Sequence, residues 1–544
     1  MALPLGFRQL NNHALSVRAR ELFDLALGSA PLFFLFLVIN WWVMSVARLP
    51  ESSYFQPSIT LELLRHAGLL HIAVILLVAG LLIWRKSPAW RWTDITHGER
   101  WRPWLLLLVT ILLWTYTTYD YNLYFDQGHY WDRILVLALA AAVVWRPIFL
   151  LPFVLLVTAL ATQYDYPIGG SSVAEQFVLV RILILFFAAL VLQSLVARPV
   201  SGAFSFLLLT LIASSYWWPG LGKLRLLWFT HGQIHLLLPA AYSSGWLAFL
   251  GSESIASISQ FLAKLDPMMV AFTLFAECGA ILFLWRRSFA RLLLGSWIVL
   301  HLGIVALSGI FFWKWMLLDL GLLWLLSRPA HLQLFPVFGR EFLLLSFVLI
   351  GASRFWYHPV NLSWYDAPVN YAYRFEAIGE SGRTYQLPPR FFTPYEYQFS
   401  LGNFGYLVRE PRLSIVYGGI WERDVAADLL AVKTAPDLFH FETARGTVRS
   451  DTRRAARFET FIQKCMTGLN ARGFRKSHFT ALQAPSQLLS FPYKAEFDGG
   501  EAIVQVDVHQ VTSLFDGAQY LEVRDEIVRQ IEIPSPVLLE PEAN

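Results

Sequence analysis

The side chains best suited to chemistry gather between residues 216 and 235, at the end of a long apolar run. Lys223 stands there in an otherwise apolar and aromatic stretch. Because burial disfavours an ammonium ion, a lysine in such surroundings can give up its proton and act as a general base near neutral pH. The alternative is a lysine that extends its charged end to the membrane surface, with Arg225 beside it. The spacing alone leaves both interpretations open.

Two further ionisable residues, Glu277 and His301, lie inside apolar runs. An ionisable side chain at membrane depth is costly, so each such residue is a functional candidate. We expect both to face a cavity or one another. Three others, Arg181, Lys314 and Asp319, either form structural pairs, extend to the membrane surface or contribute to function.

Two histidines, His231 and His235, are four residues apart. On a helix this spacing presents two imidazoles on one face, as a metal site requires. No third ligand stands nearby in the sequence. We therefore predict a polar face at the membrane surface, and no metal.

The composition indicates a membrane protein that also has a polar part. Of the 544 residues, 56% are hydrophobic and 15% are charged, which excludes a soluble globular enzyme, a disordered chain and a fibrous repeat. There are 43 Lys and Arg and 39 Asp and Glu residues; 42 of these charged residues follow residue 360, whereas 20 of the 22 tryptophans precede residue 361. We predict a multi-span transmembrane domain over residues 1–360 and a soluble domain over residues 361–544. The net charge of +4 is too small to indicate a nucleic-acid partner.

Apolar runs that could cross a bilayer recur throughout the first 360 residues, since a span needs roughly 20 apolar residues. Clear runs lie near 26–47, 67–84, 104–118, 148–163, 176–197, 203–218, 268–285, 289–308 and 311–327, and weaker ones near 132–145 and 341–353. The predicted fold class is a polytopic α-helical membrane protein of about 11 spans. Pro219, Gly220 and Gly222 are expected to break the 203–218 span at its outer end.

Lys and Arg residues in short loops set the orientation of such a protein. The N-terminal segment carries Arg8, Arg18 and Arg20, and basic residues recur in every second loop. The loops between them are poor in basic residues; one of them contains Asp120 and Asp126. This alternation predicts a cytoplasmic N-terminus and an extracytoplasmic C-terminal domain, in a bacterial inner membrane or an ER-type membrane.

The part after residue 360 is predicted to be an α+β domain rich in strands. Residues 501–511 alternate apolar and polar side chains, as a half-buried strand does. Residues 373–385 are typical of a hairpin, with a turn at Glu380-Ser381-Gly382. Residues 451–472 indicate an amphipathic helix with Asp451 as its N-cap.

One stretch of the chain resembles a known family. Tyr216, Gly220, Lys223, Leu224 and Trp228 match in order and spacing the signature of the vitamin K-dependent γ-carboxylase and its relatives, the horizontally transferred transmembrane (HTTM) domain family. A second stretch is similar too. It contains Glu277, the basic turn 285–289, His301 and the aromatic residues 311–313.

The resemblance implies an integral membrane enzyme that couples hydroquinone epoxidation to carboxylation of Glu in an exported peptide or protein. Reduced vitamin K or a related membrane hydroquinone would be the cofactor, with O2 and CO2 as co-substrates. Lys223 would be the base that deprotonates the hydroquinone, and His301 the second catalytic residue. The residues expected around the quinone and substrate are Tyr216, Trp217, Trp228, His231, His235 and Glu277.

Two other functions compete with this one. The membrane domain could anchor an extracytoplasmic recognition domain that binds an exported partner and assists its maturation without catalysis. This alternative predicts that Lys223→Ala has no effect and that truncation after about residue 360 abolishes function. A transporter is disfavoured, because the sequence has no internal repeat with paired broken helices.

Overall fold

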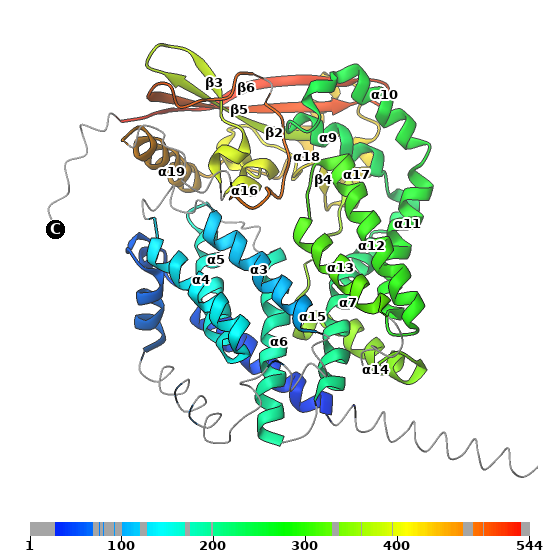
Figure 1. Cartoon of the computed structure of the whole chain (residues 1–544). Coiled ribbons are helices and arrows are strands. Elements are labelled where there is room, and N and C mark those ends of the chain that lie inside the picture. Colours follow the sequence, from blue (N-terminus) through cyan, green and yellow to red (C-terminus); the bar gives the residue numbers. More distant parts are fainter. Residues whose placement is uncertain are drawn as a thin grey trace, which may run out of the picture.

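The computed structural model describes residues 25, 28–68, 76, 80, 92, 101–119, 128–168, 174–196, 200–328, 337–360, 362–393, 395–471, 482–492 and 494–534 (Figure 1). Over these residues the protein is mostly helical, and the named strands all follow residue 364. Figure 1 shows the strands as a layer across one end of a group of helices. The structure thus shows apolar helices in the first part of the chain and strands in the last part, as the sequence predicts.

Five of the described helices are long and apolar enough to cross a membrane. They are Gly28–Val46, Pro147–Asp165 (which includes α5, Leu150–Thr162), Phe177–Val196 in α6 (Ala174–Val196), Gly202–Arg225 in α7 (Ser201–Arg225) and α12 (Arg287–Ser308). A sixth candidate is a bent pair, α10 (Ser252–Ala263) followed by Asp266–Leu282, whose axes differ by 68°. Such lengths match the roughly 17–25 residues that a span needs.

Other predicted apolar runs form helices that are shorter than a usual span. They are α3 (Arg102–Thr118), α4 (Tyr130–Trp145), α13 (Trp313–Ser327) and α14 (Arg340–Gly351), with 17, 16, 15 and 12 residues. Three helices are shorter still: α8 (Trp228–His231) and α9 (Leu237–Ser243) lie between α7 and α10, and α15 (Ser353–Trp356) follows α14. Most of the 67–84 run, the N-terminal arginines, the basic residues of 85–100, Asp120 and Asp126 lie outside the described residues. The predicted number of spans therefore stays a prediction.

The expected break at Pro219 is wrong, because α7 continues through it to Arg225. A proline is tolerated inside such an apolar helix because neighbouring helices and side chains can satisfy the backbone group whose hydrogen bond the proline removes. Gly220 has a different role: a Cβ there would lie 2.9 Å from the backbone nitrogen of Cys278. The glycine therefore allows α7 and α11 (Asp266–Cys278) to approach closely. Lys223 lies on the last turn of α7.

The strand-containing part is built on a four-stranded antiparallel sheet in the order β3-β2-β5-β6. Its strands are β2 (Val369–Gly379), β3 (Thr384–Gln386), β5 (Ile503–Phe515) and β6 (Tyr520–Glu532), and β1 (Tyr365–Asp366) pairs separately with β4 (Gly419–Ile420). The helices here are α16 (Glu396–Leu401), α17 (Arg423–Leu429), α18 (Ala435–Arg445) and α19 (Thr452–Ala471).

The predictions for this part are confirmed where the residues are described. The 373–385 hairpin is β2 and β3, with Ile378 opposite Thr384, and the 501–511 strand is the first part of β5. The amphipathic helix is α19. Asp451 caps it, since its Oδ1 accepts hydrogen bonds from the backbone N–H groups of Arg453 and Arg454, both at 3.0 Å.

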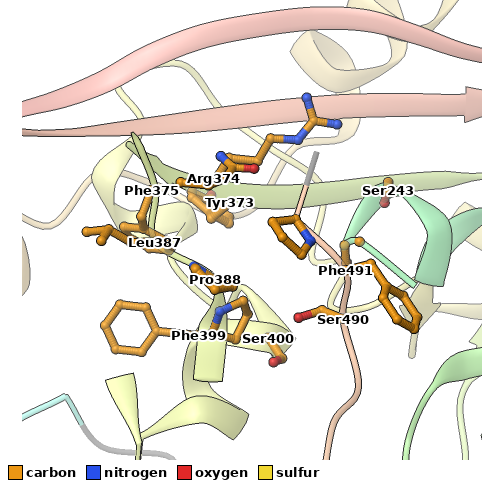
Figure 2. Close-up of a pocket in the computed structure, with 15 residues that line it drawn as sticks. Ser243, Tyr373, Arg374, Phe375, Leu387, Pro388, Phe399, Ser400, Ser490 and Phe491 are labelled. Atoms are coloured by element: carbon orange, nitrogen blue, oxygen red, sulfur yellow. The ribbon is translucent and has the colours of Figure 1, made fainter. Parts of the chain in front are cut away.

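An extended segment, residues 482–492, joins the sheet to the helices, and we call it the strap. Phe311 N–H donates to Gln487 O at 2.7 Å, Leu489 N–H to Gly309 O at 2.9 Å and Phe491 N–H to Gly245 O at 2.8 Å. Figure 2 shows the pocket of about 40 Å³ at this junction, with Ser490 and Phe491 of the strap near Ser243, and Tyr373 and Phe399 also on its wall.

Gly309 tests how strongly the strap is fixed. Its φ is +70°, and an added Cβ would lie 2.8 Å from Leu489 O and 2.8 Å from the Trp246 ring. We expect Gly309→Ala to lower the free energy of unfolding by at least about 1–2 kcal/mol, from the left-handed backbone alone. Thermal unfolding in detergent measures this.

Gly303→Ala is the matched control for this prediction, because Gly303 lies in α12, the helix that Gly309 directly follows, and no atom lies within 4 Å of its added Cβ. Replacing a helical glycine with alanine should leave stability unchanged or raise it. Equal stability of the two variants would show that the strap does not constrain this turn.

Candidate functional site

A cavity of about 360 Å³ lies among the spanning helices, where they meet the strand-containing part. Its walls come from α6, α7, α11, α12 and α13, from Phe312, from residues 357–360 and Leu362, and from Tyr397 and Gln487. The lining residues used below are Arg181, Ser215, Tyr216, Glu277, His301, Phe312, Trp315, Tyr357, Leu362, Tyr397 and Gln487. Its size lies within the roughly 300–1,000 Å³ of small-molecule sites, and its mixture of apolar walls and few polar groups is typical of them.

Lys223 and Glu277 form a buried ion pair at the edge of this cavity. Lys223 Nζ lies 2.8 Å from both carboxylate oxygens of Glu277, and the two side chains are only 6% and 9% exposed. The ammonium also donates to Leu362 O at 2.9 Å and lies 5.1 Å from the centre of the Trp228 ring. Lys223 is therefore buried, and its nitrogen is engaged by a carboxylate, a backbone carbonyl and an indole ring.

Trp228 acts on the same lysine from a second direction. Leu227 adopts a left-handed conformation after α7, which turns the chain into α8 and brings Trp228 over the ammonium. The indole N–H donates to Trp364 O at 2.7 Å, so it also holds the 362–366 segment. A cation over an indole face is stabilised by about 1–2 kcal/mol when water is excluded.

Tyr216, His301 and Asp319 form a second buried polar group, and the first two of these residues line the cavity. Tyr216 Oη lies 2.5 Å from Asp319 Oδ2 and 2.9 Å from His301 Nε2. The phenol has one proton, so when it donates to the carboxylate it accepts from Nε2–H of the imidazole. His301 Nδ1 is then an acceptor, and it has no hydrogen-bond partner among the described residues.

Aromatic rings fix the position of Tyr216. Its ring stacks on Trp297 with centroids 3.8 Å apart and planes 5° apart, and the edge of Trp315 packs against it at 5.5 Å. His301 contacts Phe312 in the same way, at 5.5 Å. The hydroxyl and the imidazole are consequently held by packing as well as by hydrogen bonds, which leaves little freedom for rearrangement.

The two histidines proposed as a pair do not share a helix face. His231 ends α8, and His235 lies in a 3-10 turn (Ile234–Leu236), because the chain leaves the helix at Gly232. His235 Nδ1 bonds to Asp266 Oδ2 at 2.5 Å, while His231 Nε2 lies 3.1 Å from Arg423 Nη2. Within the described ranges no three His, Cys, Asp or Glu residues are placed to hold a metal.

Of the residues proposed from the sequence, three line the cavity: Tyr216, Glu277 and His301. Lys223 reaches it through Glu277 and Leu362. Trp217 points to another side of α7, where it packs half-buried against the main hydrophobic core. Trp228 contacts Lys223, whereas His231 and His235 bond to residues away from the cavity.

Sequence reasoning named two further contributors to the site without assigning them a role, and it missed a third. Asp319 and Arg181 were visible as charges within apolar runs, but their roles depend on contacts between distant helices. The third is the segment after α15, whose Tyr357 and Leu362 complete the cavity. It carries no motif, so no signal in the sequence pointed to it.

Asp366 lies buried beyond the Lys223–Glu277 pair, outside the spanning helices. Trp364 Nε1 donates to its Oδ1 at 3.2 Å, and the backbone of Gln233 also interacts with the carboxyl. Burial raises the pKa of Asp366 to about 7, and the Asp266 carboxylate acts in the same direction; the bond from Trp364 and the charge of Lys223 oppose them. The protein therefore holds this carboxyl protonated at mildly acidic pH.

This carboxyl predicts a dependence of stability on pH. The folded-state pKa of about 7 exceeds the ordinary value of 3.8, so the folded protein binds more protons than the unfolded chain between these values. Its contribution to stability is complete below the lower value and is lost as the pH rises to about 7. Asp366→Asn should remove this loss, on the order of a few kcal/mol, in unfolding measured from about pH 5 to about pH 8.

Asp428→Asn is the control, because it makes the same substitution at an exposed carboxylate. Its pH dependence should match that of the wild type. If Asp366→Asn keeps the full wild-type slope, the carboxyl at this position is ionised in the folded protein.

No family model, curated protein or solved structure matches this chain. What the site does is therefore argued from the arrangement of its own residues. Its defining feature is a small apolar cavity with a lysine–glutamate pair and a tyrosine–histidine–aspartate group converging on it.

Proposed function

We propose that the protein is an integral membrane enzyme similar to the vitamin K-dependent γ-carboxylase. It would use a reduced membrane quinone, O2 and CO2 to carboxylate glutamate residues of an exported peptide or protein. The observation that carries this proposal is the cavity among the spanning helices, which has aromatic walls and the buried Lys223–Glu277 pair at its edge. A flat, apolar ring with polar oxygens suits such a site.

In this proposal the chain crosses the membrane about 11 times, with the N-terminus in the cytoplasm and the strand-containing part outside. Shorter helices such as α4 and α14 would then cross a locally thinned bilayer or extend through adjoining residues. Two observations support the arrangement: the sheet lies across one end of the helices (Figure 1), and 42 of the 82 charged residues lie in the last 184 positions.

When bound, the reduced quinone supplies the driving force: its oxidation by O2 yields a base strong enough to remove a γ-proton from glutamate, after which CO2 adds to that carbon. The chain's own task is to start this sequence by accepting a proton from the quinone hydroxyl. Lys223 can accept it once its own proton has passed to Glu277, whose oxygens are 2.8 Å away. Neutralising both partners leaves no charge unpaired in the dry interior.

His301 would hold the quinone at the other polar group of the cavity. Its Nδ1 is the acceptor left without a partner among the described residues, and the Tyr216 hydroxyl fixes the tautomer that keeps it so. Asp319 acts through Tyr216, so it is a positioning residue. The aromatic residues Phe312 and Trp315 exclude water, which would otherwise quench a strong base.

Replacement of Lys223 tests the proposal. We expect Lys223→Met to lower quinone epoxidation in nanodiscs by at least about a hundredfold, the usual contribution of a general base. Because this change leaves Glu277 buried without its partner, the double variant Lys223→Met/Glu277→Gln is the version that should fold well while staying inactive. Epoxidation is measured with reduced naphthoquinone and benzoquinone, with and without a glutamate peptide.

Lys264→Met is the control, because Lys264 is exposed at the end of α10. Full epoxidation by the double variant would remove Lys223 from the mechanism. Absence of epoxidation in the wild type with every quinone tested would instead favour the non-catalytic anchor, for which Lys223 is only structural.

A further inference from the structure

Arg181 is a charged residue of the cavity that the proposed proton transfer does not use. It lies within the Phe177–Val196 span and lines the same cavity as Tyr216 and His301. Its guanidinium lies 5.0 Å from the centre of the Tyr357 ring. Its Nε is buried without a hydrogen-bond partner, and no carboxylate of the described residues lies within ion-pair distance of it.

This arrangement is costly unless something else pairs with the arginine. A guanidinium inside a span usually faces a counter-charge or a water-filled cavity. Tyr357 offers a ring face and an uncharged hydroxyl that interacts with the guanidinium and also lies 2.7 Å from Ser215 Oγ, so it supplies no counter-charge. Lys223, the cation at the edge of the cavity, has Glu277 as its partner, whereas Arg181 has no such carboxylate among the described residues.

The position of Arg181 indicates the side from which a partner would come. Arg181 lies seven residues after the first residue of α6, about 10 Å along the helix axis from that end. The helix before α6 ends at the strand-containing part, where Gln398 Nε2 donates to Tyr164 O at 3.3 Å. Tyr397 and Gln487, also from that part, line the cavity. A ligand group arriving from the side of the sheet would thus meet the arginine.

We infer that Arg181 binds a carboxylate group of a polypeptide ligand that reaches the cavity from the side of the sheet. The planar guanidinium presents paired N–H donors that match the two oxygens of a carboxylate, which a lysine could not do. The identity of the ligand as the glutamate side chain to be modified rests on the proposed function. The cavity then has separate places for the two reactants: the Lys223 and His301 groups for the ring, and Arg181 for the acid.

A binding measurement tests this inference without requiring turnover. Full-length protein in detergent is titrated with a capped pentapeptide that has one central glutamate, and with the same peptide carrying glutamine. Trp315 lines the cavity, so quenching of tryptophan fluorescence reports binding. We expect the glutamate peptide to bind the wild type roughly tenfold more tightly, and Arg181→Gln to abolish this preference.

Arg354→Gln is the matched control. Arg354 is exposed, three residues before Tyr357, and its guanidinium also lies over a ring, that of Trp218. This variant should keep the full preference for glutamate. If Arg181→Gln does not fold, Arg181→Lys keeps the charge without the paired donors and should keep only part of the preference.

Equal binding of the two peptides by the wild type, or a preference that survives Arg181→Gln, overturns the inference. It is also overturned if a short-chain phosphatidylglycerol, but not the glutamate peptide, binds in an Arg181-dependent manner, since the anion would then be a lipid phosphate. Epoxidation is assayed separately. Glutamate-selective binding without epoxidation would contradict the proposed function alone, and epoxidation without selective binding would contradict this inference alone.

Discussion

The need to satisfy a charge in a dry interior governs this part of the molecule. Lys223 is buried, so its ammonium must find partners within the protein. It finds them in Glu277, in the carbonyl of Leu362 and in the face of Trp228. Each contact imposes a requirement on the fold: α7 must lie against α11, which Gly220 allows, and the segment after α15 must return to the end of α7.

The same requirement joins the two parts of the chain. Residues 357–360 and 362–366 follow the helices and close the cavity, and Leu362 and Trp364 accept the bonds from Lys223 and Trp228 just before β1 begins. The predicted division at residue 360 falls in the middle of this segment. One continuous hydrophobic cluster also runs from the spanning helices into the sheet. The cavity is thus a product of both parts and belongs to neither alone.

How much the sequence could predict follows from the kind of signal each element carries. The hairpin, the strand of residues 501–511 and the cap of α19 are local patterns, and they were predicted well. The continuation of α7 through Pro219 was not, because it depends on packing by neighbours. When a helix is apolar on all sides, its sequence does not indicate which of its faces packs against which neighbouring helix. Hence Tyr216, Glu277 and His301 could be named as candidates, whereas the bond of Tyr216 to Asp319 could not be foreseen.

The late position of the strap in the sequence determines when the helices gain their hydrogen bonds to it during synthesis. It pairs with Gly245, Gly309 and Phe311, yet it is synthesised only after β1 to β4 and α16 to α19. Helices α12 and α13 are therefore complete while the turn between them still lacks its backbone partners. The wall that carries His301 is fastened only when the chain has grown past Phe491. Until then the nascent protein has the ionisable side chains of the helices but an open cavity, so the closed cavity would be among the last features to form.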